Sequence, residues 1–170
     1  MAFNFTFVDN QRLGLQIVGA NSTGTSQQPL GFKRVVVDND NNVAGEVMYL
    51  GGNDNDPNYK LGCCGGYYFS GERFIFSKAA GTPIFGVFFK DKNGVYIQTG
   101  GLAYVQVEAP LSKGAKVYFS NSSTNKLTST SSAGVEVKGA IAGDPAQKIT
   151  VNISGTPTDL YPVYLNNPHL

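Results

Sequence analysis

The chain has 170 residues, of which 41% are hydrophobic, and a formal net charge of +1, so we expect one soluble domain, or two small ones, with a buried core. The balance of 13 basic and 12 acidic residues removes the attraction on which nonspecific nucleic-acid binding depends. The longest apolar run, residues 84–89, is much shorter than the roughly 20 residues of a membrane-spanning helix. We therefore expect neither nucleic acid nor a membrane among the partners.

The composition favours strands over helices. Glycine accounts for 21 of the 170 residues, well above the average share of about 7%, and 11 Phe and 9 Tyr are present without Trp. Apolar residues do not recur with a helical period in any window of about 12 residues, so any helix should be one or two turns long. We predict an all-β fold, a compact antiparallel β-barrel or β-sandwich.

The N-terminal residues 1–31 are predicted to form an extended arm followed by a flexible loop. Phe3, Phe5 and Phe7 alternate with polar residues, which is typical of a strand with one buried face. Residues 19–31 contain few large apolar side chains and are expected to be a loop or linker. The arm either pairs within its own subunit or adds a strand to the open sheet edge of a neighbour.

The body, residues 32–153, carries most of the predicted strands, because short apolar runs alternate there with clusters of Asn, Asp, Gly and Ser. An Asn-Gly pair in residues 91–94 predicts a hairpin. Ile149, Val151 and Ile153 should lie on one buried face of the last body strand. Including one run in the arm, the predicted strands cover residues 13–18, 32–37, 43–50, 73–77, 83–90, 95–98, 102–108, 115–120, 135–141 and 148–153.

The C-terminal residues 154–170 are predicted to form an irregular tail. Within residues 154–165 two prolines, Pro157 and Pro162, interrupt a stretch with Tyr and Leu but no strand-like alternation. The tail either packs on its own body or binds a neighbouring subunit. The second alternative is open because exposed aromatic surface tends to mark a contact site.

Groups suited to catalysis are few in this sequence. His169 is the only histidine, and we expect it to lie in a disordered chain end. Cys63 and Cys64 are adjacent, and a disulfide between them would be strained, so we expect two free thiols. Nucleotide-binding glycine motifs are absent from the sequence. We therefore predict that the chain is not an enzyme and has no catalytic, cofactor-binding or metal-binding residue.

Two segments of the sequence are rich in acidic residues and Asn. Residues 38–42 begin like a calcium loop, but Val43 stands where that loop needs glycine and Tyr49 where it needs glutamate. Residues 53–56 are also rich in oxygen ligands, so the two segments are either solvated turns or a shared weak cation site. The five acids from residue 38 to residue 56, with no Lys or Arg among them, form either a solvated face or an edge for a basic partner. They are Asp38, Asp40, Glu46, Asp54 and Asp56.

The order of features between residues 83 and 153 resembles that of bacteriophage capsid decoration proteins, also called structural cement proteins. Residues 44–50 are similar to a strand near the start of that family's body. The features that carry the resemblance are Phe85-Gly86-Val87, Gly100-Gly101 before a strand over 102–108, the segment 111–118 ending in Val117-Tyr118, Lys126-Leu127-Thr128, and a closing strand over 149–153.

The resemblance implies a β-barrel or β-sandwich that binds the outside of a virus head, usually as a trimer, without catalytic residues. We therefore expect a virion structural protein that stabilises the capsid shell, made in the host cytoplasm and located on the capsid surface. Its expected partners are the major capsid protein and its own copies, in a homo-oligomer that should be a homotrimer. The alternative is a carbohydrate-binding β-sandwich module of a virion fibre or tail, because turns rich in Asn, Ser, Thr and Tyr suit a sugar.

Overall fold

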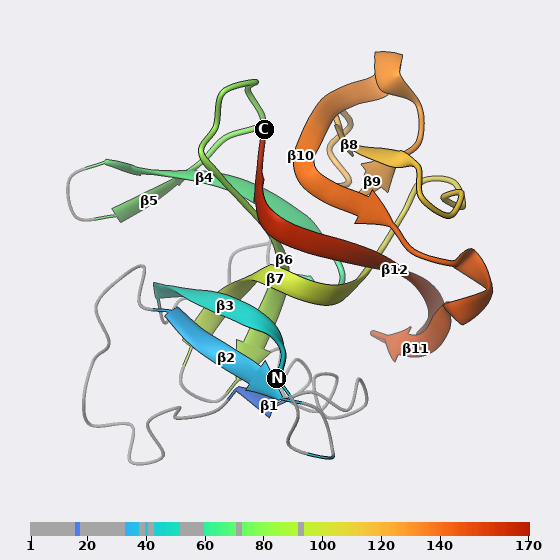
Figure 1. Cartoon of the computed structure of the whole chain (residues 1–170), viewed down its shortest axis with the longest axis horizontal. Coiled ribbons are helices and arrows are strands. Elements are labelled where there is room, and N and C mark those ends of the chain that lie inside the picture. The colour runs from blue at the N-terminus through green and yellow to red at the C-terminus, as the bar shows by residue number, and fades with distance from the viewer. Residues whose placement is uncertain are drawn as a thin grey trace.

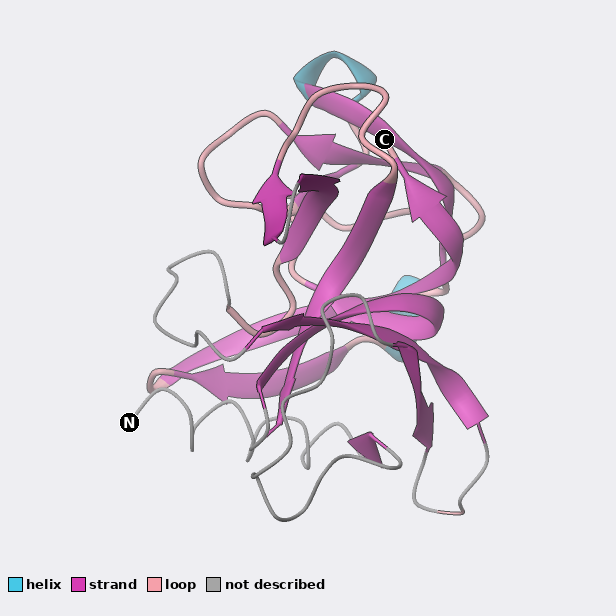
Figure 2. Cartoon of the chain, turned by 90° about the vertical axis from the view of Figure 1, so that its left-hand side faces the viewer, coloured by secondary structure: helices cyan, strands magenta, loops and turns pink. Residues whose placement is uncertain are grey.

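The computed structural model describes residues 16–17, 33–37, 40, 43–51, 60–70, 73–91 and 94–170. The regular structure of these residues consists of antiparallel strands and two short 3-10 turns, without an α-helix (Figure 1 and Figure 2). The predicted all-β fold is confirmed. The elements are β1 (Gln16–Ile17), β2 (Lys33–Val37), β3 (Val43–Gly51), β4 (Cys64–Ser70), β5 (Arg73–Phe76), β6 (Ile84–Asp91), β7 (Gly94–Val105), β8 (Lys116–Ser120), β9 (Leu127–Thr128), η1 (Ser131–Ala133), β10 (Gly134–Ala142), η2 (Pro145–Gln147), β11 (Ile149–Ile153) and β12 (Thr156–His169).

The strands form one branched sheet. The main path runs in the order β1-β2-β3-β7-β12-β10-β8-β9, and from it β6 pairs with β7, β4 with β6, β5 with β4, and β11 with β12. None of the described strands joins β9 back to β1, so the sheet is not closed and the sandwich-like form of the prediction fits.

The long strand β7 explains the branching (Figure 1). Residues 94–98 pair with β6, whereas residues 100–105 pair with β12, and β3 runs along the opposite edge. One strand therefore belongs to two layers. The runs 95–98 and 102–108, predicted as separate strands, are joined in β7, with Gly100 and Gly101 inside the strand and not before it.

Glycine permits the bend in β7. Gly101 adopts φ +82°, a conformation that costs other residues more than glycine. The neighbouring strand lies very close at this point, because a Cβ atom on Gly45 would lie 2.0 Å from the carbonyl oxygen of Gly100. The change of partner in β7 therefore depends on small residues in two strands.

The main hydrophobic core lies between β6, the second half of β7, β8, β10 and β12. At its centre Phe85 and Phe119 are fully buried and meet edge to face, with ring centroids 5.3 Å apart. A second cluster lies under β3, β4, β6 and β7 and contains Leu50, Tyr67, Phe88, Val95 and Ile97. A third, small cluster under β11 and β12 contains Leu61, Val151 and Leu160.

The local sequence predictions agree well with these elements. Every run predicted from residue 13 onward overlaps a strand, and the predicted hairpin joins β6 to β7, with Asp91 opposite Gly94. The predicted face of β11 is also confirmed, because Val151 is buried and Ile149 and Ile153 pack against the third cluster. The strand β4 was not among the predicted runs.

The prediction of an irregular tail over residues 154–170 is wrong. Residues 156–169 form β12, a strand inside the sheet that pairs in turn with β11, β7 and β10. The prolines are tolerated because β12 changes partners along its length. Pro157 lies in the β11–β12 hairpin, and the carbonyl of Pro162 still accepts a bond of 2.8 Å from the amide of Gly143.

Only Gln16 and Ile17 of the N-terminal arm are among the described residues, and they pair with β2 as the short strand β1. The predicted strand around Phe3, Phe5 and Phe7 and the loop 19–31 lie outside the described residues. Within the described part of the chain, no helix has the length and apolar character needed to cross a membrane.

Candidate interaction surfaces

The hairpin β4–β5 carries exposed aromatic side chains. Tyr68 is 41% and Phe69 is 54% exposed, although Tyr67 beside them is buried in the second cluster. Because alternate residues of a strand share a face, Phe69 lies on the same face of β4 as the buried Tyr67. Phe69 is nevertheless exposed, because it lies further along the hairpin, beyond the second cluster. It rests against Phe74 of β5, with ring centroids 5.3 Å apart. Figure 1 shows this hairpin extending away from β12 and β10.

A second exposed apolar surface lies on the side of the sheet that faces away from the main core. Tyr164 of β12 is opposite Leu102 of β7 on one side and Ile141 of β10 on the other. Tyr164 is 57% and Ile141 is 54% exposed, and Leu102 is half-buried. Tyr164 and Ile141 are each flanked in sequence by buried residues of the main core, and Leu102 is followed by the buried Ala103. We call this surface the open face.

Charged side chains stand at both ends of the open face. Lys116 of β8 is opposite Ile141, its side chain is 75% exposed, and it forms an ion pair of 3.0 Å with Glu136. At the other end Glu46 of β3 is exposed and lies opposite Gly100, where its Cβ and Cγ atoms cover the position that a side chain would take.

Glu108 forms a polar network with the loop after β8. One carboxylate oxygen of Glu108 accepts hydrogen bonds from the hydroxyls of Ser120, Ser122 and Thr124, at 2.7, 2.5 and 3.0 Å. These bonds, led by those from Ser122 and Ser120, hold the pKa of Glu108 below its usual value. The carboxylate is therefore engaged in fixing the loop.

Lys78 fixes the same loop from the other side. Its ammonium group donates to the carbonyls of Ser120 and Ser122, at 2.9 and 2.6 Å, and lies 4.6 Å above the centroid of the Phe119 ring. Partial burial lowers the pKa of Lys78. The partners of this ammonium group all belong to the same chain, as expected for a residue that holds a loop in place.

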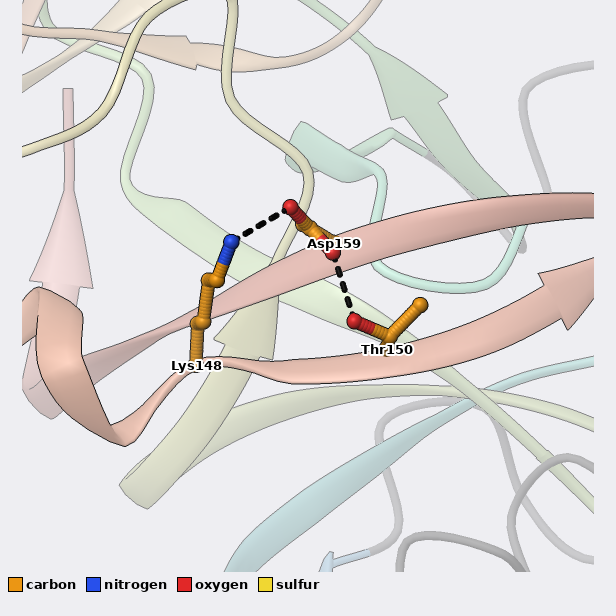
Figure 3. Close-up of polar contacts among 3 residues, drawn as sticks. All are labelled: Lys148, Thr150 and Asp159. Carbon is orange, nitrogen blue, oxygen red and sulfur yellow. Dashed lines mark hydrogen bonds and ion pairs between the residues drawn. The ribbon is translucent and has the colours of Figure 1, made fainter.

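Figure 3 shows a polar cluster on the β11–β12 hairpin. Asp159 accepts from the ammonium of Lys148 at 2.8 Å and from the hydroxyl of Thr150 at 2.6 Å. The bond to Lys148, followed by that to Thr150, lowers the pKa of Asp159. Because Thr150 and Asp159 are direct cross-strand partners, the cluster supports the register of the hairpin, with a small contribution at an exposed position.

Cys63 and Cys64 are both free thiols, as predicted, and both are buried. The Cys63 thiol lies 3.8 Å from the carbonyl oxygen of Thr124, and Cys64 packs in the main core. Burial raises the pKa of both thiols, and for Cys64 the neighbouring Cys63 adds to the effect. The position of these residues points to packing at the start of β4.

The structure describes only part of the acidic segments. Asp40 and Glu46 are exposed, whereas Asp38, Asp54 and Asp56 lie outside the described residues, as do residues 53–56 and all of 38–42 except Asp40. Among the residues that are described, no three His, Cys, Asp or Glu side chains are grouped as metal ligands would be. The two alternatives, solvated turns or a shared weak cation site, therefore stay untested.

His169 is ordered and not part of a disordered end, which corrects the expectation from sequence. It is the last residue of β12, opposite Lys138, and is exposed, with Nδ1 3.1 Å from the carbonyl oxygen of Asn167. The main chain of Leu170 holds the end of β12 in place, since its amide donates to Thr82 and its carbonyl accepts from Gly81.

Sequence reasoning identified neither exposed surface as such. The hairpin residues Tyr68 and Phe69 were missed together with β4, and their only signal was a run of aromatics. For Tyr164 the signal was the aromatic content of residues 154–170, but its neighbours Leu102 and Ile141 come from strands far away in the sequence. Compared with known proteins, the chain matches no family model, no curated protein and no solved structure.

Proposed function

We propose that this chain is a virion structural protein that binds the outer surface of a phage head and stabilises the capsid shell, and that it is not an enzyme. The observation that carries the proposal is the pair of exposed aromatic side chains, Tyr68 and Phe69, on a hairpin that extends from the body. The ordered features from residue 83 to residue 153, which resemble decoration proteins, support it.

The β4–β5 hairpin is suited to binding a protein surface. Aromatic side chains supply a large contact area with little loss of conformational entropy and often dominate binding energy. Tyr67 of the same strand is anchored in the second cluster, so the exposed pair is presented on a supported backbone. We assign this hairpin to the contact with the major capsid protein.

A shell-binding role does not require high affinity at each site. The symmetry of a capsid repeats the same contact many times, and a homo-oligomer on several shell subunits multiplies modest affinities. A trimer around threefold positions, as the resemblance implies, is the arrangement that we propose on the capsid surface. The near-neutral charge of the chain fits a contact that relies on shape and apolar area.

Co-sedimentation with expanded capsid shells tests the proposal. We expect the wild-type protein to sediment with the shells and Phe69→Ser to weaken binding by at least tenfold, because most of that ring is exposed. Ile141→Ser is the matched control, since it removes an equally exposed apolar side chain elsewhere. It should lose far less shell binding. A folded wild-type protein without affinity for the shells would contradict the proposal.

The carbohydrate-binding alternative rests on the same exposed rings, because aromatic side chains also stack on sugars. An NMR titration with a set of glycans separates the two functions. Glycan-induced shifts centred on Tyr68 and Phe69, in a protein that does not sediment with shells, would favour the alternative. Shell binding without glycan-induced shifts would support the capsid function.

A further inference from the structure

We propose that the outer edge of β5 receives residues 3–7 of a neighbouring copy of this chain as an added antiparallel strand. This segment reads Phe-Asn-Phe-Thr-Phe and lies outside the described residues. The inference rests on the homo-oligomer of the proposed function and assigns the contact that holds its copies together. It leaves the contact with the shell free, because Tyr68 and Phe69 belong to β4.

The main chain of β5 directs hydrogen-bonding groups away from β4. The amide of Ser77 donates to the carbonyl of Gly66 at 2.8 Å, and the β4–β5 register continues from that pair without a shift. Because bonded and non-bonded pairs alternate in an antiparallel ladder, Ile75 bonds to β4, whereas the amides and carbonyls of Phe74 and Phe76 point outward. Among the described strands only β4 pairs with β5, so this edge is open to a further strand.

The strand β5 lacks the features that usually protect an open edge. Natural edge strands often carry Lys or Pro, or a bulge that twists the edge away. Residues Arg73–Phe76 include neither Lys nor Pro, and their pairing with β4 has no bulge. The one charged residue, Arg73, stands at the first position of the strand. An unprotected edge of this kind favours a partner strand.

An aromatic face of the hairpin ends at this edge. Tyr67 contacts Phe76 with ring centroids 5.7 Å apart, and Phe69 contacts Phe74 at 5.3 Å. These cross-strand pairs lie on one face, because alternate residues of a strand point the same way. Phe74 and Phe76 are half-buried. Apolar side chains on an added strand would extend the row and cover their open side.

Residues 3–7 have the pattern that this edge requires. With Phe side chains opposite Phe74 and Phe76, the phenylalanines of the segment continue the aromatic face, while Asn4 and Thr6 share the other face with Ile75. No other part of the sequence has aromatic residues at three successive alternate positions. Main-chain bonds then supply attachment and the alternating side chains supply specificity.

A neighbouring copy is the source of the strand because of the length of the connection. Residues 8–15 link the segment to β1, and β1 and β5 are opposite ends of the path β1-β2-β3-β7-β6-β4-β5. This path measures six strand spacings, about 29 Å, which eight residues cover only when fully extended. No length remains for the turns out of β1 and into the edge. Exchange of one arm per copy also closes a ring, as a trimer requires.

Disulfide trapping tests the contact in the full-length protein. Two registers place a Phe opposite both Phe74 and Phe76, and they put either Asn4 or Thr6 opposite Ile75. Directly opposite residues of a non-bonded pair lie about 4.5 Å apart, within the range of a disulfide. We expect Ile75→Cys, combined with Asn4→Cys or with Thr6→Cys, to give disulfide-linked dimers and larger species on mild oxidation, visible on a non-reducing gel. The native thiols Cys63 and Cys64 are buried.

The matched control places the second cysteine on another exposed surface. Ile141 is 54% exposed on the open face, so Ile141→Cys combined with the same arm substitutions should give no linked species. Circular dichroism should show that all variants are folded.

A pair of proline substitutions tests the main-chain bonds. In the proposed strand the amide of Phe5 donates to β5, whereas the amide of Thr6 points away from it. Phe5→Pro should therefore weaken association by about tenfold or more in sedimentation velocity. Thr6→Pro should associate nearly like the wild type, because proline is tolerated where the N–H of an edge strand faces solvent.

Three results would overturn the inference. One is a disulfide formed within a single chain, which leaves a monomer without free surface thiols. Another is the absence of linked species in both double variants. The third is equal association of Phe5→Pro and Thr6→Pro.

The failure of this inference and that of the capsid function are distinguishable. Linkage between copies in a protein that does not sediment with shells would support the strand exchange and contradict the capsid function. Shell binding without linkage would do the reverse. The number of copies in the linked ring separately tests the threefold arrangement.

Discussion

At the scale of single residues, Glu108 shows how a surface carboxylate can order a loop. Three hydroxyl groups converge on one of its oxygens, and Lys78 holds two carbonyls of the same loop. The segment after β8 is thus fixed by charge-assisted hydrogen bonds at its surface, while its hydrophobic support comes from Phe119 below.

The lowered pKa of Glu108 makes its contribution depend on pH. A carboxyl group with a depressed folded-state pKa stabilises the fold above its unfolded-state value and loses this effect as pH falls through the folded-state value. We expect Glu108→Gln to lower the free energy of unfolding by about 0.5 kcal/mol at pH 7, since the position is exposed. Urea unfolding should show this difference shrinking as pH falls from 4.5 towards about 2.

The control for Glu108 is Glu46→Gln, which removes an exposed carboxylate of the open face. It should change the free energy of unfolding at pH 7 much less than Glu108→Gln does. A stability difference for Glu108→Gln that is the same at both ends of the pH range would contradict the assigned cause.

The two cysteines give a second prediction at the residue scale. Burial keeps Cys63 and Cys64 protonated and away from reagents. With a thiol reagent such as DTNB at about pH 8, below the usual thiol pKa, we expect labelling of the native protein to be at least a hundredfold slower than labelling in guanidinium. Rapid reaction of either thiol in the folded protein would show that the start of β4 opens readily.

At the scale of elements, β12 has the largest effect on the fold. It pairs with β7 and β10 on opposite edges and extends into the β11 hairpin. Alternating residues face different surroundings, because Val163 and Leu165 enter the main core while Tyr164 between them stays exposed. One strand therefore connects the core to the open face.

The attachment of the end of β12 can be measured. The Leu170 side chain is buried in the main core, so Leu170→Ala should lower the free energy of unfolding by about 2–3 kcal/mol through lost burial and a cavity. His169→Ala, the change of its exposed neighbour, should stay within about 0.5 kcal/mol of the wild type. Chemical denaturation of both variants provides the comparison, and equal effects would show that the main chain alone anchors this end.

At the scale of the whole molecule, one branched sheet covers three hydrophobic clusters and leaves two apolar surfaces exposed, counted over the residues that the structure describes. The β4–β5 hairpin and the open face come from different strands, so each can be changed without removing the other. In the proposed function the hairpin contacts the shell. Because the two surfaces are separate, the effect of a single substitution can be assigned to the surface that carries it.

The sequence by itself determined those features that depend on neighbouring residues. Alternation in Ile149, Val151 and Ile153 placed one face of β11 in a core, and the Asn-Gly pair predicted the hairpin between β6 and β7, because side-chain period and turn propensity are local properties. Local signals failed where glycine or proline replaced the alternating side chains, as at Gly65 and Gly66 in β4 and at the prolines of β12. At Gly66 a Cβ atom would lie 2.3 Å from the carbonyl of Ser77, a close approach that no local pattern indicates.

Only the tertiary structure decided which distant residues share a surface. Leu102, Ile141 and Tyr164 are ordinary apolar residues in their own segments, and they form one row only through the pairing of β7, β12 and β10. Register between strands far apart in sequence is set by the burial of whole faces and by changes of partner at bends and bulges. Those are collective properties of the folded sheet, which is why the open face could not be read from any single segment.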